Sequence, residues 1–169
     1  AHVDAARRRL AELTGELGIQ IPVYVMVTKC DLVAGFTEFF EDLSPDGRRQ
    51  VWGVTFPYEQ TLANQGPEVF PQEFDALMAR LNERVYTRVE DVRDVRRRTL
   101  VFAFPQQMAA LRDSLTQFVN EVFSATRFDQ QILLRGVYLT SGTQTGTPID
   151  RLLVDAHFGY YRERSVVDR

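Results

Sequence analysis

Four consecutive residues, Thr28-Lys29-Cys30-Asp31, combine side chains that could read a nucleotide base. An ionised Asp offers two acceptor oxygens to neighbouring N–H donors, and guanine presents such donors on N1 and on its 2-amino group, whereas adenine does not. A site whose carboxylate would be left without donors rejects the wrong base by roughly 10⁴-fold. The residue types and their spacing match the pattern with which GTPases read guanine, and they predict that Asp31 sets the base preference.

Lys29 and Thr28 have supporting roles in this interpretation. The long stem of Lys29 would lie along the base or ribose while its ammonium reaches backbone carbonyls, and the Thr28 hydroxyl would tether neighbouring loops. Lys29 is the only lysine of the chain. The pattern is short, however, and typical residue frequencies place it somewhere in a chain of this length roughly one time in twenty. An ordinary surface turn carrying Lys and Asp therefore stays open as the alternative.

The residues that a nucleotidase needs for its phosphates are missing from the sequence. A G-x-x-x-x-G-K-[ST] loop requires a second lysine, which the chain does not have. We find no candidate for a magnesium-holding acid, and the two histidines, His2 and His157, lie far apart and far from the lone Cys30. We therefore predict no catalytic residues, no metal site and no cofactor for this chain, with GTP expected only in a completed domain.

Composition restricts the classes of protein to which the chain can belong. Its 169 residues carry a formal charge of −3, so no overall field favours nucleic acid, and we expect no nucleic-acid partner. The single cysteine fits a reducing compartment. The longest apolar run, from Ile21 to Val27, is far shorter than the roughly 20 residues of a membrane-spanning helix. Because the chain also begins without Met, we expect a piece of a longer protein.

Two predicted strands position the base motif. The run from Ile21 to Thr28 is apolar without alternation, which favours a strand covered on both faces, and Leu133 to Thr140 is the second strand. Since ligands bind beyond the carboxyl ends of the strands in open α/β sheets, Thr28–Asp31 and Thr140–Gly142 should face one site. The predicted base-binding residues are Thr28, Lys29, Asp31, Ser141 and Gly142.

Helical periodicity occupies most of the remaining chain and indicates an α/β fold with parallel strands in a single domain. Its predicted parts are a strand with the base motif (1–60), a helical segment (68–125), and a strand, loop and helix (132–158). Residues 99–104 could extend a helix or form a strand. The expected helices cover residues 2–17, 36–43, 70–92, from 105 onward and from 149 onward, with a brief strand at 51–56.

Several strings in the chain resemble one known family, in the same order. They are IPVYVMVTKCDL (21–32), FTEFF (36–40), WGVTFP (52–57), FPQQ (104–107) and LRGVYLTSGTQTGTPIDRL (134–152). On these strings the chain resembles the IcmF/TssM family, inner-membrane components of bacterial type VI secretion. The likeness extends from about residue 3 to residue 153.

The resemblance implies part of a P-loop-NTPase or GTPase-like domain in the cytoplasmic region of an inner-membrane protein. The implied role is a scaffold whose partners are TssL and TssJ in the membrane complex, TssK and TssG in the baseplate, and the remainder of its own GTPase-like domain. The alternative is one half of an active GTPase whose phosphate loop lies upstream. With that half missing, the strand at Ile21–Thr28 should keep an unpaired backbone edge.

Overall fold

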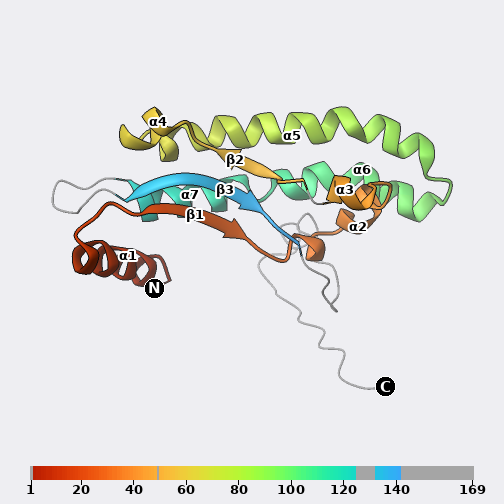
Figure 1. Cartoon of the computed structure of the whole chain (residues 1–169). Helices are drawn as coiled ribbons and strands as arrows, with labels where there is room; N and C mark the ends of the chain where they lie inside the picture. The colour runs from red at the N-terminus through yellow and green to blue at the C-terminus, as the bar shows by residue number, and fades with distance from the viewer. Residues whose placement is uncertain (1, 49, 125–131, 142–169) are drawn as a thin grey trace, which may run out of the picture. The chain divides into compact units, whose positions relative to one another are not determined.

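The computed structural model describes residues 2–48, 50–124 and 132–141, and it shows a mostly helical α/β chain with a small sheet (Figure 1). The described backbone divides into two compact units. The first unit comprises residues 1–27, 51–79 and 111–140. The second comprises 28–50 and 80–110 and continues from Ser141. The expected helix from residue 149 lies outside the described residues, and the single-domain organisation stays a prediction.

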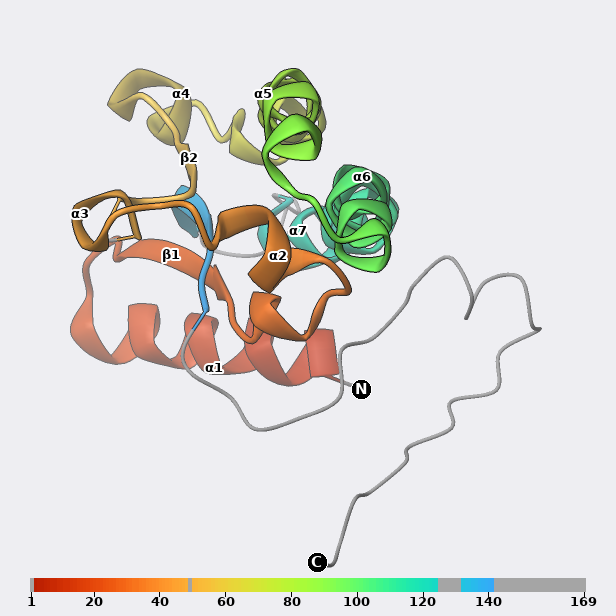
Figure 2. The ribbon, with the colours of Figure 1, turned by 90° about the vertical axis from the view of Figure 1, so that its right-hand side faces the viewer.

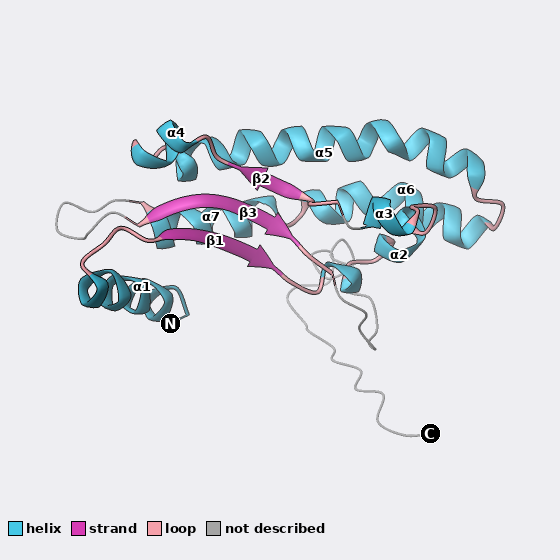
Figure 3. Ribbon diagram, viewed as in Figure 1, coloured by secondary structure: helices cyan, strands magenta, loops and turns pink. Residues whose placement is uncertain are grey.

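The sheet of the first unit has three strands in the order β1-β3-β2 (Figure 3). β1 (Pro22–Val27) and β3 (Leu133–Leu139) are parallel, which confirms the predicted pair. β2 (Gly53–Thr55) falls within the expected brief strand but runs antiparallel to β3, so the sheet is mixed rather than parallel. Gly53 permits this close pairing, because a Cβ there would lie 2.3 Å from the Val137 carbonyl oxygen.

The prediction that β1 is covered on both faces is wrong for the described residues. Exposed and half-buried positions alternate along the strand, and Tyr24 and Met26 remain 50% and 61% exposed. Helix α7 (Arg112–Phe123) lies behind the sheet in Figure 1 and on one side of it in Figure 2. An apolar run indicates that a strand can be buried, but it does not indicate which element covers each face.

Two further helices of the first unit pack on α7 and on β3. α1 (His2–Leu17) ends where predicted, at Gly18 with φ of 63°, and it packs on α7. α4 (Tyr58–Leu62) packs on β3, and its buried Thr61 hydroxyl donates to the Leu134 carbonyl oxygen at 3.3 Å. Arg135 of β3 donates in return to the Phe56 carbonyl oxygen at 2.6 Å.

α5 (Gly66–Asp91) is the predicted long helix, but it begins four residues before the predicted start and ends one residue before the predicted end. In the first unit its Asp75 accepts two hydrogen bonds from Arg112, at 2.6 and 2.8 Å. The side-chain hydrogen bond from Arg112 holds the pKa of Asp75 below its usual value. The pair therefore ties the first part of α5 to the start of α7.

α6 (Val95–Ala109) resolves the question left open at residues 99–104, which form the middle of this helix. Asp94 caps the helix by accepting from the Arg97 backbone N–H at 2.8 Å. The predicted helix start at Pro105 is wrong, because Pro105 lies inside α6 and the following helix begins only at Arg112. Pro is more frequent in the first turn of a helix, and the Asp94 cap was the better start signal.

Aromatic packing forms the core of the second unit. α2 (Phe36–Phe40) is the predicted short helix, and it packs against α6. The Phe39 ring, which is fully buried, lies 4.9 Å from the Phe104 ring, and the Phe40 ring lies 5.5 Å from it. Gly35 precedes α2 with φ of 86°, and a Cβ there would lie 2.3 Å from the Leu100 carbonyl oxygen. Only glycine fits both requirements at this position.

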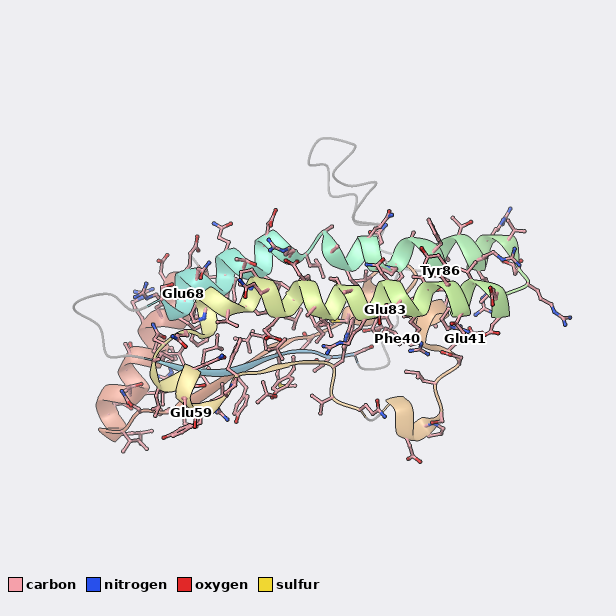
Figure 4. The ribbon with its side chains drawn as sticks, turned by 90° about the horizontal axis from the view of Figure 1, so that it is seen from above. Phe40, Glu41, Glu59, Glu68, Glu83 and Tyr86 are labelled. Atoms are coloured by element: carbon pink, nitrogen blue, oxygen red, sulfur yellow. The ribbon has the colours of Figure 1, made fainter. Side chains whose placement is uncertain are left out.

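A buried arginine closes the carboxyl end of α2. Arg88 of α5 is 3% exposed and donates to the carbonyl oxygens of Phe39 at 3.0 Å and Glu38 at 2.8 Å. Asp42 lies 3.3 Å from its Nε and balances its charge. A cation that caps the last carbonyls of a helix is favourable in both charge and hydrogen bonding. In Figure 4, Phe40 and Glu41 at this end of α2 lie beside the part of α5 that carries Glu83 and Tyr86.

Replacing Arg88 by Ala tests this cap. We expect Arg88→Ala to lower the free energy of unfolding by about 2–3 kcal/mol, because one buried and one partly buried carbonyl oxygen lose a charged donor. The matched control is Arg80→Ala on the same helix, an exposed position where the change should stay within about 0.5 kcal/mol. Urea denaturation followed by circular dichroism measures both values. Equal effects of the two substitutions would contradict the capping role.

Candidate functional site

The carboxyl ends of β1 and β3 lie side by side, as the base-site prediction requires. Val27 pairs with Leu139 in the parallel register. Beyond the last pair, the Thr140 backbone N–H donates to the Val27 carbonyl oxygen at 2.8 Å, and its hydroxyl donates to the same oxygen at 3.3 Å. Thr28 and Ser141 are the next residues along the two strands, so chain continuity brings them to the same edge. Gly142 lies outside the described residues.

Lys29 adopts a left-handed backbone conformation, with φ of 62° and ψ of 33°. A residue with a Cβ occupies this region at a cost of roughly 1–2 kcal/mol, and such residues are most frequent at functional sites and tight turns. The Lys29 side chain is exposed. Its conformation turns the chain out of the β1 direction and directly into the one-turn helix η1 (Cys30–Leu32).

Asp31 lies in η1, and its carboxyl group is partly withdrawn from solvent. The Oδ1 atom is buried and has no hydrogen-bond partner among the groups that the structure describes. An acceptor without a donor fits a ligand edge that carries N–H groups, as guanine does. Because this oxygen is out of contact with solvent, a base could reach it only after neighbouring groups move.

The packing of the second unit anchors the chain that follows the motif. Cys30 is 2% exposed and Ala34 is 7% exposed. η1 contacts α2, which in turn packs on α6. Sequence reasoning did not identify Gly35 or Arg88, which hold α2 in place. Gly35 immediately before a phenylalanine-rich helix was an available signal, whereas nothing distinguished Arg88 from the other arginines of α5.

The part of the site that would hold phosphates is not represented in the chain. The sequence contains no phosphate loop, as its single lysine is Lys29. Within the described residues no group of three or more His, Cys, Asp or Glu side chains could hold a metal ion.

β1 is paired on one side only, with β3, among the strands that the structure describes. This agrees with the expectation that the strand keeps an unpaired edge. Such an edge presents a row of N–H and C=O groups to which another strand can bind. The base motif therefore follows a strand whose sheet can be extended on the side away from β3.

Replacing Lys29 by glycine removes the strain of its left-handed backbone and tests whether the Lys29 side chain contributes to stability. We expect Lys29→Gly to raise the free energy of unfolding by about 0.5–1 kcal/mol, because glycine adopts the left-handed conformation without the Cβ penalty. Asn64 has φ of 55° and serves as the control. Asn tolerates this region, so Asn64→Gly should change stability by only a few tenths of a kcal/mol, at about the lower limit of urea measurements. A loss of stability in Lys29→Gly would show that its side chain makes structural contacts.

In the described part of the chain, no helix combines the length and apolar character needed to cross a membrane. The model of the IcmF-related N-terminal domain family matches residues 1–166. The type VI secretion system component TssM1 of Pseudomonas aeruginosa is 50% identical over 154 residues, which are 90% of this chain and 14% of that relative. No solved structure matches the chain. From the family match and this relative, the chain belongs to the IcmF-related family.

Proposed function

We propose that this chain is a cytoplasmic scaffold and docking region of a type VI secretion membrane complex, and that it carries an incomplete guanine-nucleotide site. The observation that carries the proposal is the position of Thr28-Lys29-Cys30-Asp31. The motif directly follows β1, whose end is joined to Thr140 and whose other edge is unpaired among the described strands. The membership in the secretion complex rests on the IcmF-related family and on the relative named TssM1.

The remainder of a P-loop-NTPase or GTPase-like domain is the partner that would complete this site. A parallel strand added to the free edge of β1 would extend the parallel β1–β3 pair, and the loop after such a strand would lie at the same carboxyl edge as Lys29. That is the edge at which α/β domains bind phosphates. The chain spans about one seventh of the length of TssM1, so ample sequence exists in that relative for such a segment.

Scaffolding is favoured over catalysis because the chain supplies surfaces and a fixed loop but no phosphate-binding group. TssL and TssJ are the proposed partners in the inner-membrane complex, and TssK and TssG are those in the baseplate. The alternative is an active GTPase domain of which this chain is one half. A phosphate loop and an Asp-x-x-Gly motif in the upstream sequence would favour this alternative, and their absence would favour the scaffold.

The chain itself should show no GTP hydrolysis and only weak nucleotide binding. Base contacts without phosphate contacts forgo most of the affinity of a nucleotide site, and the Asp31 Oδ1 is closed to solvent. Isothermal titration calorimetry with GTP should therefore detect no binding at micromolar concentrations, and ATP is the matched control ligand. Micromolar binding of GTP but not of ATP would contradict the incomplete site.

In the full-length protein, Asp31→Asn separates base reading from assembly. If Asp31 reads guanine, the amide changes the acceptor and donor pattern and should shift the preference from guanine toward xanthine nucleotides by at least about tenfold. The scaffold proposal expects co-purification with TssL and TssJ to stay unchanged. Asp46→Asn, at an exposed position of the short helix α3 (Pro45–Arg48), is the control.

Two results of the Asp31→Asn experiment would contradict the proposal. An unchanged base preference would reduce Asp31 to a structural turn residue. Loss of TssL and TssJ in the Asp31→Asn protein, with normal folding and normal assembly of Asp46→Asn, would show that nucleotide recognition is needed for assembly. That outcome would support the GTPase alternative.

A further inference from the structure

One side of α6 is exposed to solvent and carries no charged residue. Between residues 99 and 109, the exposed positions are Thr99, Phe102, Gln106 and Ala109. Val95, one turn before Thr99, is 72% exposed, and Phe102 is 57% exposed. Because these five residues follow one another at intervals of four and three, they lie along one side of the helix. We call this side the outer face of α6.

The opposite side of α6 is buried within the second unit. Val101, Phe104 and Met108 are fully buried, and α2 packs on this helix. A solvated helix normally carries charged residues on its outer side, whereas a helix without them on any side is typical of the interior of a protein or an assembly. The part of α5 in the same unit shows the solvated pattern, since Glu83 and Glu90 are exposed on it. The outer face of α6 therefore has the composition of a contact surface.

The polar side chains of the outer face can be covered at little cost. The Thr99 hydroxyl donates to the Val95 carbonyl oxygen of the same helix at 3.0 Å, so it needs no water when it is buried. The Gln106 amide has both donors and an acceptor, and it can bond to a polar group of whatever packs beside it. The face is thus suited to burial against another apolar surface.

A basic group flanks the amino-terminal end of the outer face. Of its four arginines, Arg97 pairs with Glu41, and Arg98 donates to a backbone carbonyl oxygen at 2.8 Å. Arg93 and Arg96 are exposed, and neither has an ion pair with another residue in the part of the chain that the structure describes. Two positive charges are therefore available to a partner at this end of the helix.

The two available arginines gain from a negatively charged partner. Arg96 lies in the first turn of α6, where a cation is unfavourable with the helix dipole. Asp94, the nearest acidic residue in the sequence, is engaged in the helix cap, where it accepts the Arg97 backbone N–H. Arg96 precedes Thr99 by three residues, so it borders the outer face. An acidic side chain on an element packed against this face would reach Arg96.

A second copy of the chain fits this face less well than a single helix of another protein. Two outer faces packed antiparallel would bring Arg96 of one copy toward Ala109 of the other, and α6 contains no acidic residue to pair with it. Parallel packing would bring like charges together. A stable dimer also buries about 800 Å² on each partner, and one face of a 15-residue helix provides less.

We propose that the outer face of α6 is a docking site for an amphipathic helix of another protein. Apolar side chains of that helix pack on Val95 and Phe102, and acidic side chains at one of its ends pair with Arg93 and Arg96. Contact through side chains spaced three and four residues apart is a general mode of helix recognition. The inference rests on the docking role of the proposed function and assigns that role a surface, and it does not involve the nucleotide site.

Photo-crosslinking in the full-length protein, in cells that carry the secretion system, tests the docking site. The photoreactive amino acid p-benzoylphenylalanine is placed at position 102, and the matched control position is 86, where Tyr86 of α5 is 75% exposed in the same unit. Mass spectrometry identifies the cross-linked peptide. We expect position 102 to capture a peptide of another protein with apolar residues three and four apart and acidic residues at one end, at a yield about tenfold that of position 86.

Charge reversal at Arg96 tests the acidic end of the docked helix. We expect Arg96→Glu to lower the cross-link yield at position 102 by about tenfold, because repulsion replaces attraction. The helix should be retained, since a negative charge in the first turn is favourable with its dipole. Arg80→Glu, at an exposed position of α5 in the same unit, is the control and should leave the yield unchanged. Circular dichroism checks that both variants keep their helices.

Four results would overturn the proposal. A cross-link within the same polypeptide would show that the protein covers the face itself, and a cross-link between two differently isotope-labelled copies would assign it to a dimer. Equal yields at positions 102 and 86 would show that the face is open. An unchanged yield in a folded Arg96→Glu protein would exclude an acidic partner. Co-purification with TssL and TssJ is measured in parallel, so failure of the docking site is distinguishable from failure of the proposed function.

Discussion

The parallel pairing of β1 with β3 is the interaction on which the candidate site depends. It aligns Val27 with Leu139, and the two hydrogen bonds from Thr140 to the Val27 carbonyl oxygen extend the alignment past the last strand pair. Two chain segments more than a hundred residues apart thereby leave the sheet at one edge. Without this register, Thr28–Asp31 and Ser141 would have no reason to act together.

The second unit determines the path of the chain after the motif. The left-handed Lys29 turns the backbone into η1, and the buried Cys30 begins the packed segment that leads to α2. Arg88 holds the carboxyl end of α2 through two carbonyl oxygens. The strain at Lys29 is tolerated because the segments on both sides of it are fixed. This is the situation in which functional sites retain unfavourable backbone conformations.

Much of the fold could be predicted from the sequence where the signal is local. Helical spacing and Gly18 predicted α1 with both ends correct, and the apolar runs predicted β1 and β3. Pro105 misled the prediction of α6, because a proline inside a helix and one at its start look alike in sequence. The antiparallel direction of β2 and the exposure of Tyr24 depend on tertiary pairing, for which a single sequence carries no signal.

The residue types of the candidate site and the position of its strands could be predicted from the sequence. The burial of its carboxylate could not. The motif predicted that Asp31 lies shortly after β1, whereas the burial of its Oδ1 depends on tertiary packing. The unpaired edge of β1 was expected from the missing phosphate-binding half, and only β3 pairs with β1 among the described strands.

Amide hydrogen exchange along β1 tests most directly whether the sheet is incomplete. In a parallel pair, the amides of an edge strand that point toward its neighbour are protected and those that point away are not. With an unpaired edge, the amides of Val23–Val27 should exchange alternately slowly and fast in this chain, and slowly throughout in the full-length protein. Uniform protection of β1 in this chain alone would contradict this prediction, since the strand would then be paired on both sides without any further segment.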